Sequence, residues 1–200
     1  MAGKSGRRPG TSDTKDAILQ AARRTFGDRG YDAASIRAIA SAASVDPALV
    51  HHYFGSKQQL FLAAVNAPID PGTFIARVID GDRDEVGHRL VRTFVTIWDG
   101  PAGVAAAAML RSAIGNEWAS KLFREFIVTQ VLRRVRTELG LDAEDAPLRM
   151  SLVASQMAGL AMVRYVLRIE PLASAPPEAI VAAIGPTLQR YLTGDVAKDI

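Results

Sequence analysis

The sequence contains no cysteine, which excludes disulfide bonds and metal sites built from thiolates. Only three histidines occur among the 200 residues, and this is poor material for general acid–base catalysis. No run of about 18 or more apolar residues is present, so no membrane-spanning helix is expected. The basic N-terminus is not followed by a long apolar segment and does not resemble a secretory signal. These absences predict a cytoplasmic protein without a cofactor, a metal or a membrane partner.

The chain is 48% hydrophobic, and its apolar residues follow the periodicity of helices. They recur three and four positions apart, and no segment shows the alternation typical of strands. We therefore predict an all-α protein. Glycine and proline separate the helical segments, for example at Gly100-Pro101 and at Gly140. Besides the segments from Ser35 onward discussed next, helices are expected at 14–28, 83–98, 102–114, 117–139, 147–169 and 177–193, with a short one near 73–80.

The segment Ser35–Lys57 predicts two short helices joined by a tight turn. Ser35 can cap the first helix. Asp46 can cap the second, with Pro47 at its first position, where a missing N–H is harmless, and Gly55 suits its end. The apolar residues expected to hold the pair together are Ile36, Ile39, Ala40, Ala43, Val50, Tyr53 and Phe54. Such a pair is a helix-turn-helix, whose second helix presents its N-terminal outer face to the edges of DNA bases.

The outer face of the second helix supplies the predicted DNA contacts. His51 can donate to or accept from a base edge, whereas Pro47, Ala48 and Leu49 can pack on a thymine methyl group. Binding affinity comes mostly from contacts with the phosphates, which position the protein without specifying the sequence. The residues assigned to phosphates are Ser35, Arg37, His52, Tyr53 and Lys57. Lys57 also begins a helix, where backbone amides favour an anion.

The charge of the chain is unevenly distributed. Residues 1–57 hold nine Lys and Arg against five Asp and Glu, a net +4, whereas residues 58–200 hold 15 against 16, a net −1. A basic first quarter is typical of a DNA-contacting end. Residues 1–12 are expected to form a disordered basic arm, whose Lys4, Arg7 and Arg8 either contact DNA or remain solvated. The arm alone does not explain Arg37 and Lys57, which stand at helix starts.

Residues 13–65 resemble the DNA-binding region of the tetracycline-repressor (TetR) family of bacterial transcription regulators. The most specific part is HHYFGSKQQLF, from His51 to Phe61, which is similar to that family's aromatic-rich recognition helix and the Ser-Lys start of the next helix. The chain departs from the family where Pro47-Ala48-Leu49-Val50-His51 replaces the usual Lys-Gly-Thr-Leu-Tyr. The resemblance therefore implies DNA binding but does not transfer an operator sequence. An ordinary helical hairpin is the alternative interpretation of the same pattern.

Residues 71–200 resemble, more loosely, the C-terminal domains of actinobacterial members of this family. The stretch Pro68–Gly72 is the expected boundary between a DNA-binding domain at 13–67 and the rest of the chain. The resemblance implies that residues 68–200 form a regulatory and dimerisation domain. It also implies a ligand pocket between helices. Arg111, Asn116 and Glu117 could orient a ligand there, or could equally be surface residues or helix caps. Candidate lining residues are Phe94, Trp98, Met109, Trp118, Phe123, Phe126, Met157 and Tyr165. Such side chains are also typical of an ordinary hydrophobic core.

The helix expected at 147–169 carries two apolar rows, so it needs two surfaces to cover it. Small residues at Ser155, Ala158 and Gly159 would allow a second backbone to come close. The alternative is that this helix and the next lie wholly inside one subunit. The resemblance favours a dimer, because TetR-like proteins pair their last two long helices as a four-helix bundle. The predicted interface residues are Leu152, Ser155, Ala158, Gly159, Met162, Val166, Ile184, Leu188 and Tyr191.

These features predict a homodimeric transcription regulator, a repressor that a small hydrophobic ligand releases from palindromic double-stranded operator DNA. One alternative is a TetR-like DNA binder whose C-terminal domain dimerises and binds no ligand. Another is a helical enzyme, but the chain has no Gly-rich phosphate loop, no Gly-x-Ser-x-Gly and no His-Glu-x-x-His. The adjacent His51 and His52 point about 100° apart on a helix and cannot share a metal ion.

Overall fold

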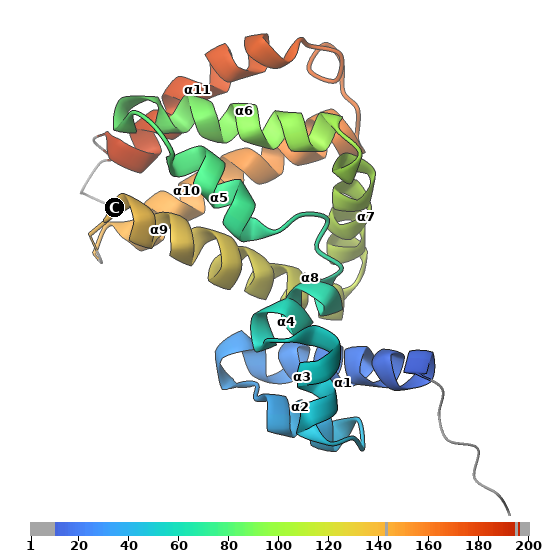
Figure 1. Cartoon of the computed structure of the whole chain (residues 1–200). Coiled ribbons are helices and arrows are strands. Elements are labelled where there is room, and N and C mark those ends of the chain that lie inside the picture. The colour runs from blue at the N-terminus through green and yellow to red at the C-terminus, as the bar shows by residue number, and fades with distance from the viewer. Residues whose placement is uncertain (1–10, 143, 195, 197–200) are drawn as a thin grey trace, which may run out of the picture. The chain divides into compact units, whose positions relative to one another are not determined.

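The computed structural model describes residues 11–142, 144–194 and 196. Every regular element within these residues is a helix, which confirms the all-α prediction (Figure 1). The chain divides into two compact units, the N-terminal unit (residues 1–67) and the C-terminal unit (residues 68–200). Most of the predicted basic arm, including Lys4, Arg7 and Arg8, lies outside the described residues. Its last two positions, Thr11 and Ser12, are instead the first residues of a helix, which is a correction.

The N-terminal unit is built on α1 (Thr11–Ala33), which packs against α2 (Ile36–Ala42) and α4 (Lys57–Val65). α1 is interrupted at Gly30, whose φ of 76° and ψ of 168° are not helical. Glycine adopts a positive φ without a steric penalty, so the helix can bend at this position. Phe26 is fully buried and lies edge-on against Phe61 of α4, with 4.9 Å between the ring centroids. This aromatic contact gives the helix-turn-helix a rigid support.

The C-terminal unit contains all the remaining helices that the structure describes beyond residue 67. They are α5 (Pro71–Ile79), η1 (Arg83–Glu85), α6 (Val86–Asp99), α7 (Ala102–Gly115), α8 (Glu117–Glu125), η2 (Phe126–Leu132), α9 (Arg133–Leu139), α10 (Ala146–Ala161), η3 (Met162–Val166) and α11 (Pro177–Thr193). Each predicted helix is present, but two contain π-helical segments, η2 and η3. The helix predicted to reach residue 169 ends at Val166, because Arg168 has a positive φ of 55° that a right-handed helix does not accept.

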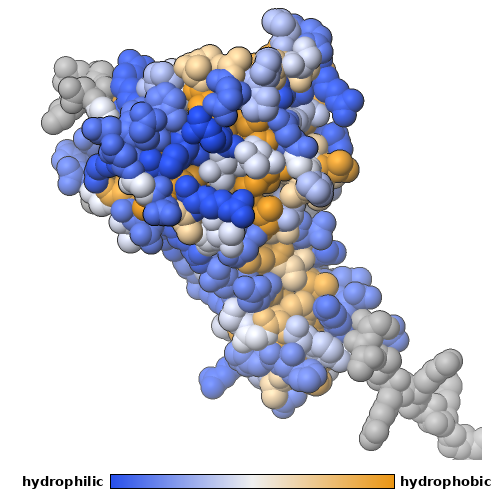
Figure 2. Space-filling model, turned by 45° about the horizontal axis from the view of Figure 1, so that its top comes forward, coloured by the Kyte–Doolittle hydropathy of each residue, from blue (hydrophilic) through white to orange (hydrophobic). Residues whose placement is uncertain are grey.

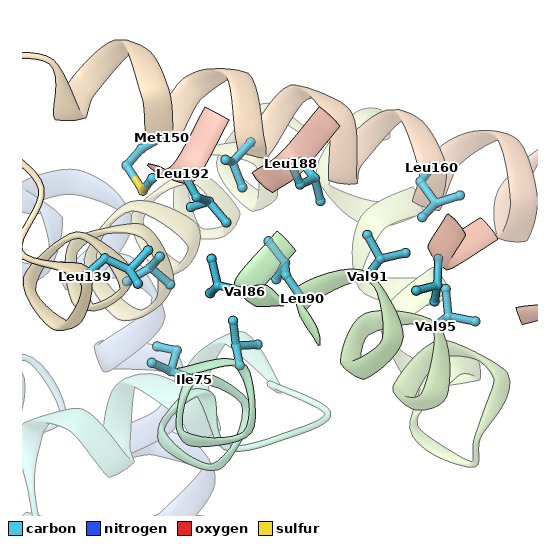
Figure 3. Close-up of a cluster of buried hydrophobic side chains, with 14 of the residues drawn as sticks. Ile75, Val86, Leu90, Val91, Val95, Leu139, Met150, Leu160, Leu188 and Leu192 are labelled. Carbon is cyan, nitrogen blue, oxygen red and sulfur yellow. The ribbon is translucent and has the colours of Figure 1, made fainter. Parts of the chain in front are cut away.

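The core of the C-terminal unit is formed by buried aliphatic side chains from α5, α6, α9, α10 and α11 (Figure 3). Val86, Val91 and Leu188 are fully buried within it. Burial of each such side chain contributes roughly 1.5–3 kcal/mol to folding. Other hydrophobic residues of this unit reach the surface among hydrophilic ones (Figure 2). On α10, Met150, Val153 and Leu160 belong to the core, whereas Leu148 is exposed.

The most extensive helix contact in the C-terminal unit joins α6 to α11. Two glycines allow it: a Cβ added at Gly87 would collide with the backbone of Gln189 and Gly185, and one added at Gly185 would collide with the His88 ring. Because the backbones are so close, the Gly87 N–H donates to the Gln189 side-chain oxygen over 2.7 Å. The Gln189 amide nitrogen in turn donates to the Arg83 carbonyl over 2.9 Å.

The segment between η3 and α11 is held by one buried guanidinium group. Arg164 is 7% exposed and donates to the carbonyl oxygens of Leu172 and Ala175 over 2.6 and 2.9 Å. Its other terminal nitrogen lies 3.4 Å from a carboxylate oxygen of Asp99, at the end of α6. The five donors of a guanidinium group suit it to this branched role. Arg164 thereby ties the irregular segment to the core helices.

No single helix among the described residues is long and apolar enough to cross a membrane. The stretch Arg83–Asp99 together with Ala102–Gly115 passes the length and composition test only as a pair bent by 96°. Val86, Leu90, Val91 and Val95 of that stretch are buried in the core, and core helices of this kind pass the same test.

Candidate DNA-binding surface and ligand cavity

The helix-turn-helix consists of α2 and α3 (Pro47–Phe54), and its predicted caps are confirmed. The Ser35 hydroxyl oxygen accepts from the Ala38 N–H over 3.1 Å. A carboxylate oxygen of Asp46 accepts from the Ala48 N–H over 2.7 Å. These bonds satisfy amides that would otherwise have no partner at the helix starts. The two helix starts are therefore set by residues that adjoin them in the sequence.

The side of α3 that faces away from the unit carries the residues predicted to contact bases. Val50 and Phe54 are buried, whereas Ala48, Leu49 and His51 are exposed and Pro47 is half-buried. Leu49 exposes 38% of its surface. An apolar side chain held in this position can pack on the methyl group of thymine.

The residues predicted to contact phosphates differ in how accessible they are. Ser35, Arg37 and His52 are exposed, whereas Tyr53 and Lys57 are half-buried. The Ser35 oxygen already accepts a capping bond, so its hydroxyl hydrogen remains available to a phosphate. The Lys57 ammonium group donates to the Asp32 carbonyl over 3.1 Å and lies 4.6 Å from the Tyr31 ring centroid. Lys57 thus also joins α4 to the end of α1, a role that sequence patterns do not reveal.

His51 makes a contact that the sequence did not predict. Its Nδ1 lies 3.0 Å from the carbonyl oxygen of Gly55, just beyond the end of α3. Gly55 has a φ of 72° and a ψ of −58°, and the Ser56 N–H donates to the Phe54 carbonyl over 2.8 Å. These values describe a γ-turn, which is rare when φ is positive. The turn directs the Gly55 carbonyl toward the imidazole ring.

A cavity of about 610 Å³ lies within the C-terminal unit, and its wall is almost entirely apolar. Six of the eight predicted lining residues contribute to it: Phe94, Trp98, Met109, Phe123, Phe126 and Met157. Among the described residues, the polar ones in the wall are Arg124, Ser151 and Ser155, all of which are exposed. The few polar groups of the wall are therefore accessible to solvent, and a mostly apolar wall with a few polar groups is typical of small-molecule sites.

Two of the predicted lining residues require correction, and for Arg111 and Asn116 the structure favours the alternative of a surface residue and a helix cap. Trp118 is 37% exposed on α8 and does not line the cavity. Tyr165 lies behind the wall, with its ring 5.0 Å from that of Trp98, and desolvation by burial raises its pKa to about 12. Arg111 is exposed away from the wall, and Asn116 caps α8 by accepting from the Ala119 N–H over 2.9 Å. Periodicity identified helical faces but not which cavity each face borders.

The π-helical segment η2 supplies a large share of the wall. Phe126, Ile127, Val128, Val131 and Leu132 all border the cavity. Residues in an ideal α-helix could not face one cavity at all these positions, but the wider turn of a π-helix rotates neighbouring side chains onto a broader face. Single-sequence patterns contain no reliable signal for such a segment, so the sequence predicted a uniform helix here.

The predicted interface residues are mostly at or near the surface of α10 and α11. Ser155, Ala158 and Gly159 are exposed, and a Cβ added at Gly159 would meet nothing within 4 Å. Leu152, Met162, Val166, Ile184 and Tyr191 are half-buried. Leu188 is a correction: its exposure is 0%, so it belongs to the core and has no surface to offer a partner. Within the described residues, no group of three or more His, Asp or Glu is placed to hold a metal ion.

Comparison with known proteins connects these features with one family. A family model described as "Bacterial regulatory proteins, tetR family" matches residues 18–64, and one described as "Tetracyclin repressor-like, C-terminal domain" matches residues 84–192. The HTH-type transcriptional regulator BetI of Rhizobium meliloti (strain 1021) is 47% identical over 53 residues, which are 26% of each chain. BetI of Brucella anthropi is 48% identical over 48 residues, 24% of this chain and 25% of that protein.

The chain thus aligns with only about a quarter of the length of the curated relatives it matches. Among solved structures, a TetR-family regulator from Streptomyces coelicolor A3 is 38% identical. That comparison covers 94% of this chain and 99% of that chain, with a TM-score of 0.48.

Proposed function

The chain belongs to the TetR family of bacterial transcription regulators, and from this premise we propose that it is a homodimeric repressor released from a palindromic operator by a small hydrophobic ligand. The observation that carries the proposal is the capped helix-turn-helix, whose recognition helix α3 exposes Ala48, Leu49 and His51. A helix of this kind fits the major groove and contacts base edges through its N-terminal half.

Dimerisation is supported by the surface of α10 that the core leaves uncovered. A hollow of about 330 Å³ is lined there by Ser155, Gly159 and Ile184, among others. A partner helix could approach closely over the small residues and fill this hollow with a side chain. Two-fold pairing would also present two recognition helices to successive major grooves, which is the arrangement a palindromic site requires.

Ligand binding is supported by the apolar cavity, whose volume lies within the range of small-molecule sites. Its wall favours an acyl or aromatic compound, and Arg124, an exposed residue of the wall, favours an anionic end such as a carboxylate. Ser155 and Ala158 belong both to this wall and to the proposed interface on α10. A ligand that shifts α10 would therefore alter how the two subunits meet, and ligand and DNA would weaken each other's binding by the same factor.

The direct test of the proposed function is selection of bound duplexes from a randomised DNA pool. We expect recovery of a palindrome that binds at least about 1000-fold more tightly than unrelated DNA at physiological salt. Binding should be measured over a range of salt concentrations, because phosphate contacts make affinity depend steeply on salt. If no preferred sequence is recovered, the proposed operator binding is wrong. Selection of a palindrome with no response to any ligand would favour the alternative regulator whose C-terminal domain only dimerises.

Arg37→Ala should weaken binding to operator and unrelated DNA by the same factor. Arg37 is exposed at the start of α2, so the change should remove a phosphate contact without altering the fold. The slope of log affinity against log salt should become shallower by about one for each phosphate that is no longer neutralised. Lys57→Ala should reduce DNA binding too, but it should also lower the melting temperature because Lys57 bonds the Asp32 carbonyl. An unchanged salt slope in Arg37→Ala would show that Arg37 does not contact a DNA phosphate.

Fluorescence of the two tryptophans can test whether a ligand enters the cavity. Trp98 lines the cavity and Trp118 does not, so Trp118→Phe retains the reporter and Trp98→Phe is its matched control. Fatty acids and aromatic carboxylates should quench emission in Trp118→Phe and leave it nearly unchanged in Trp98→Phe. At about 100 times its Kd, a ligand should stabilise the fold by roughly 2.7 kcal/mol, seen as a thermal shift. A compound that binds but does not release operator DNA is not an inducer.

A further inference from the structure

The contact between His51 and Gly55 determines which hydrogen-bonding group a neutral His51 ring can offer to DNA. A carbonyl oxygen can only accept, so the proton of this 3.0 Å bond must be on Nδ1 of His51. In a neutral imidazole ring the second nitrogen, Nε2, then carries a lone pair and no hydrogen. Nε2 also points away from Gly55, because the two nitrogens lie on different sides of the ring. His51 is exposed, so this acceptor is open to a partner.

The backbone at Gly55 holds the ring in this state. The Gly55 N–H donates to the His51 carbonyl over 2.8 Å, and the Gly55 carbonyl accepts from the His51 ring, so the two residues are joined twice. The second bond depends on the γ-turn, because the φ of 72° and ψ of −58° turn the Gly55 carbonyl back toward α3. A residue with a Cβ is strained at this φ, although a Cβ at Gly55 would meet nothing within 4 Å. The requirement for glycine is therefore conformational.

We propose, building on the proposed operator binding, that His51 contacts DNA as an acceptor through Nε2 and selects a base with an amine in the major groove. Adenine presents its N6 amine there and cytosine its N4 amine. Guanine N7 and O6 and thymine O4 are acceptors, and each would place a lone pair against that of Nε2. His51 thus distinguishes adenine and cytosine from guanine and thymine at one position of each half-site. Gly55 is the positioning residue for this selection.

Base analogues in the selected operator test the proposal on the full-length protein. At each adenine, purine removes the N6 amine and 7-deazaadenine removes the N7 acceptor; at each cytosine, 2-pyrimidinone removes the N4 amine. We expect removal of the amine at one position per half-site to weaken binding by about fivefold, the effect of one neutral hydrogen bond. Removal of N7 at that position should have no effect. His51→Ala should bind the amine-containing and amine-lacking operators equally.

Two further variants separate contact from structure. His52→Ala changes the same residue type one position along, where the side chain points about 100° away. As a phosphate-contact variant it should weaken binding to all DNA alike, but it should keep the full sensitivity to the amine. Gly55→Ala should retain binding to unrelated DNA and lose the preference for adenine or cytosine. Circular dichroism and thermal unfolding show whether each variant is folded.

The outcomes distinguish this proposal from the function on which it rests. Sensitivity to N7 with indifference to the amine would show that His51 donates, and would overturn the proposal while leaving operator binding intact. Indifference to every analogue at all positions, in a protein that still selects its operator, would show that His51 makes no base contact. If the protein selects no preferred DNA sequence, both the proposed operator binding and the proposed base contact of His51 are wrong.

Discussion

Gly159→Arg should yield monomers that fold normally and bind a palindromic operator about 100-fold more weakly than the unaltered protein. Within one subunit the substitution meets no obstacle, since Gly159 is exposed and a Cβ there has no neighbour within 4 Å. In the proposed dimer, the arginine would place an unpaired charge where two helices meet, and desolvation of such a charge is costly. The weaker DNA binding follows because a monomer offers one recognition helix where the two-fold complex offers two.

Light scattering measures whether the variant is monomeric, thermal unfolding measures whether it is folded, and an operator-binding assay measures the loss of DNA affinity. Gly115→Arg is the matched control, because Gly115 is also exposed, has no neighbour within 4 Å and stands at the end of α7, away from the proposed interface. It should remain dimeric. A Gly159→Arg protein that is fully dimeric in solution would show that the partner surface lies elsewhere on the molecule.

Gly87→Ala should destabilise the C-terminal unit by about 3 kcal/mol, at the upper end of the usual penalty for overpacking. The added methyl group would collide with the backbone of Gln189 and with the Gly185 carbonyl, and neither can move as a flexible side chain would. Separation of α6 from α11 would also break the bond from the Gly87 N–H to the Gln189 side chain. The melting temperature should fall by about 10 °C for a chain of this size.

Gly115→Ala tests whether replacing a helical glycine is itself harmful. It should leave the melting temperature nearly unchanged or raise it slightly, because alanine is the better helix former and nothing lies in its way. Gly185→Ala should lower the melting temperature less than Gly87→Ala, since its methyl group would collide with the His88 ring, which is a side chain and not backbone. Equal melting temperatures for Gly87→Ala and the unaltered protein would mean that α6 and α11 can separate without any cost in packing.

Local chemistry made much of this protein predictable from its sequence. The caps at Ser35 and Asp46 bond to amides two or three residues away, so the starts of α2 and α3 can be predicted from the residue types next to them. The limits of α11 follow in the same way from Pro177 and Gly194, which border its helical periodicity. The motif from His51 to Phe61 indicated the family, because it combines an aromatic-rich helix with a capped start of the next one.

The tertiary structure decided what lies against each helical face, because periodicity marks a face as apolar without identifying its neighbour. Leu188 and Gly159 both belong to apolar or small-residue rows, but one is in the core and the other is open. Trp98 lines a cavity and Trp118 does not, although both are on helices of similar pattern. The hydrogen-bonding state of His51 likewise depends on the direction of the Gly55 carbonyl, which is set by a γ-turn. The residue types alone do not determine the backbone dihedral angles of that turn.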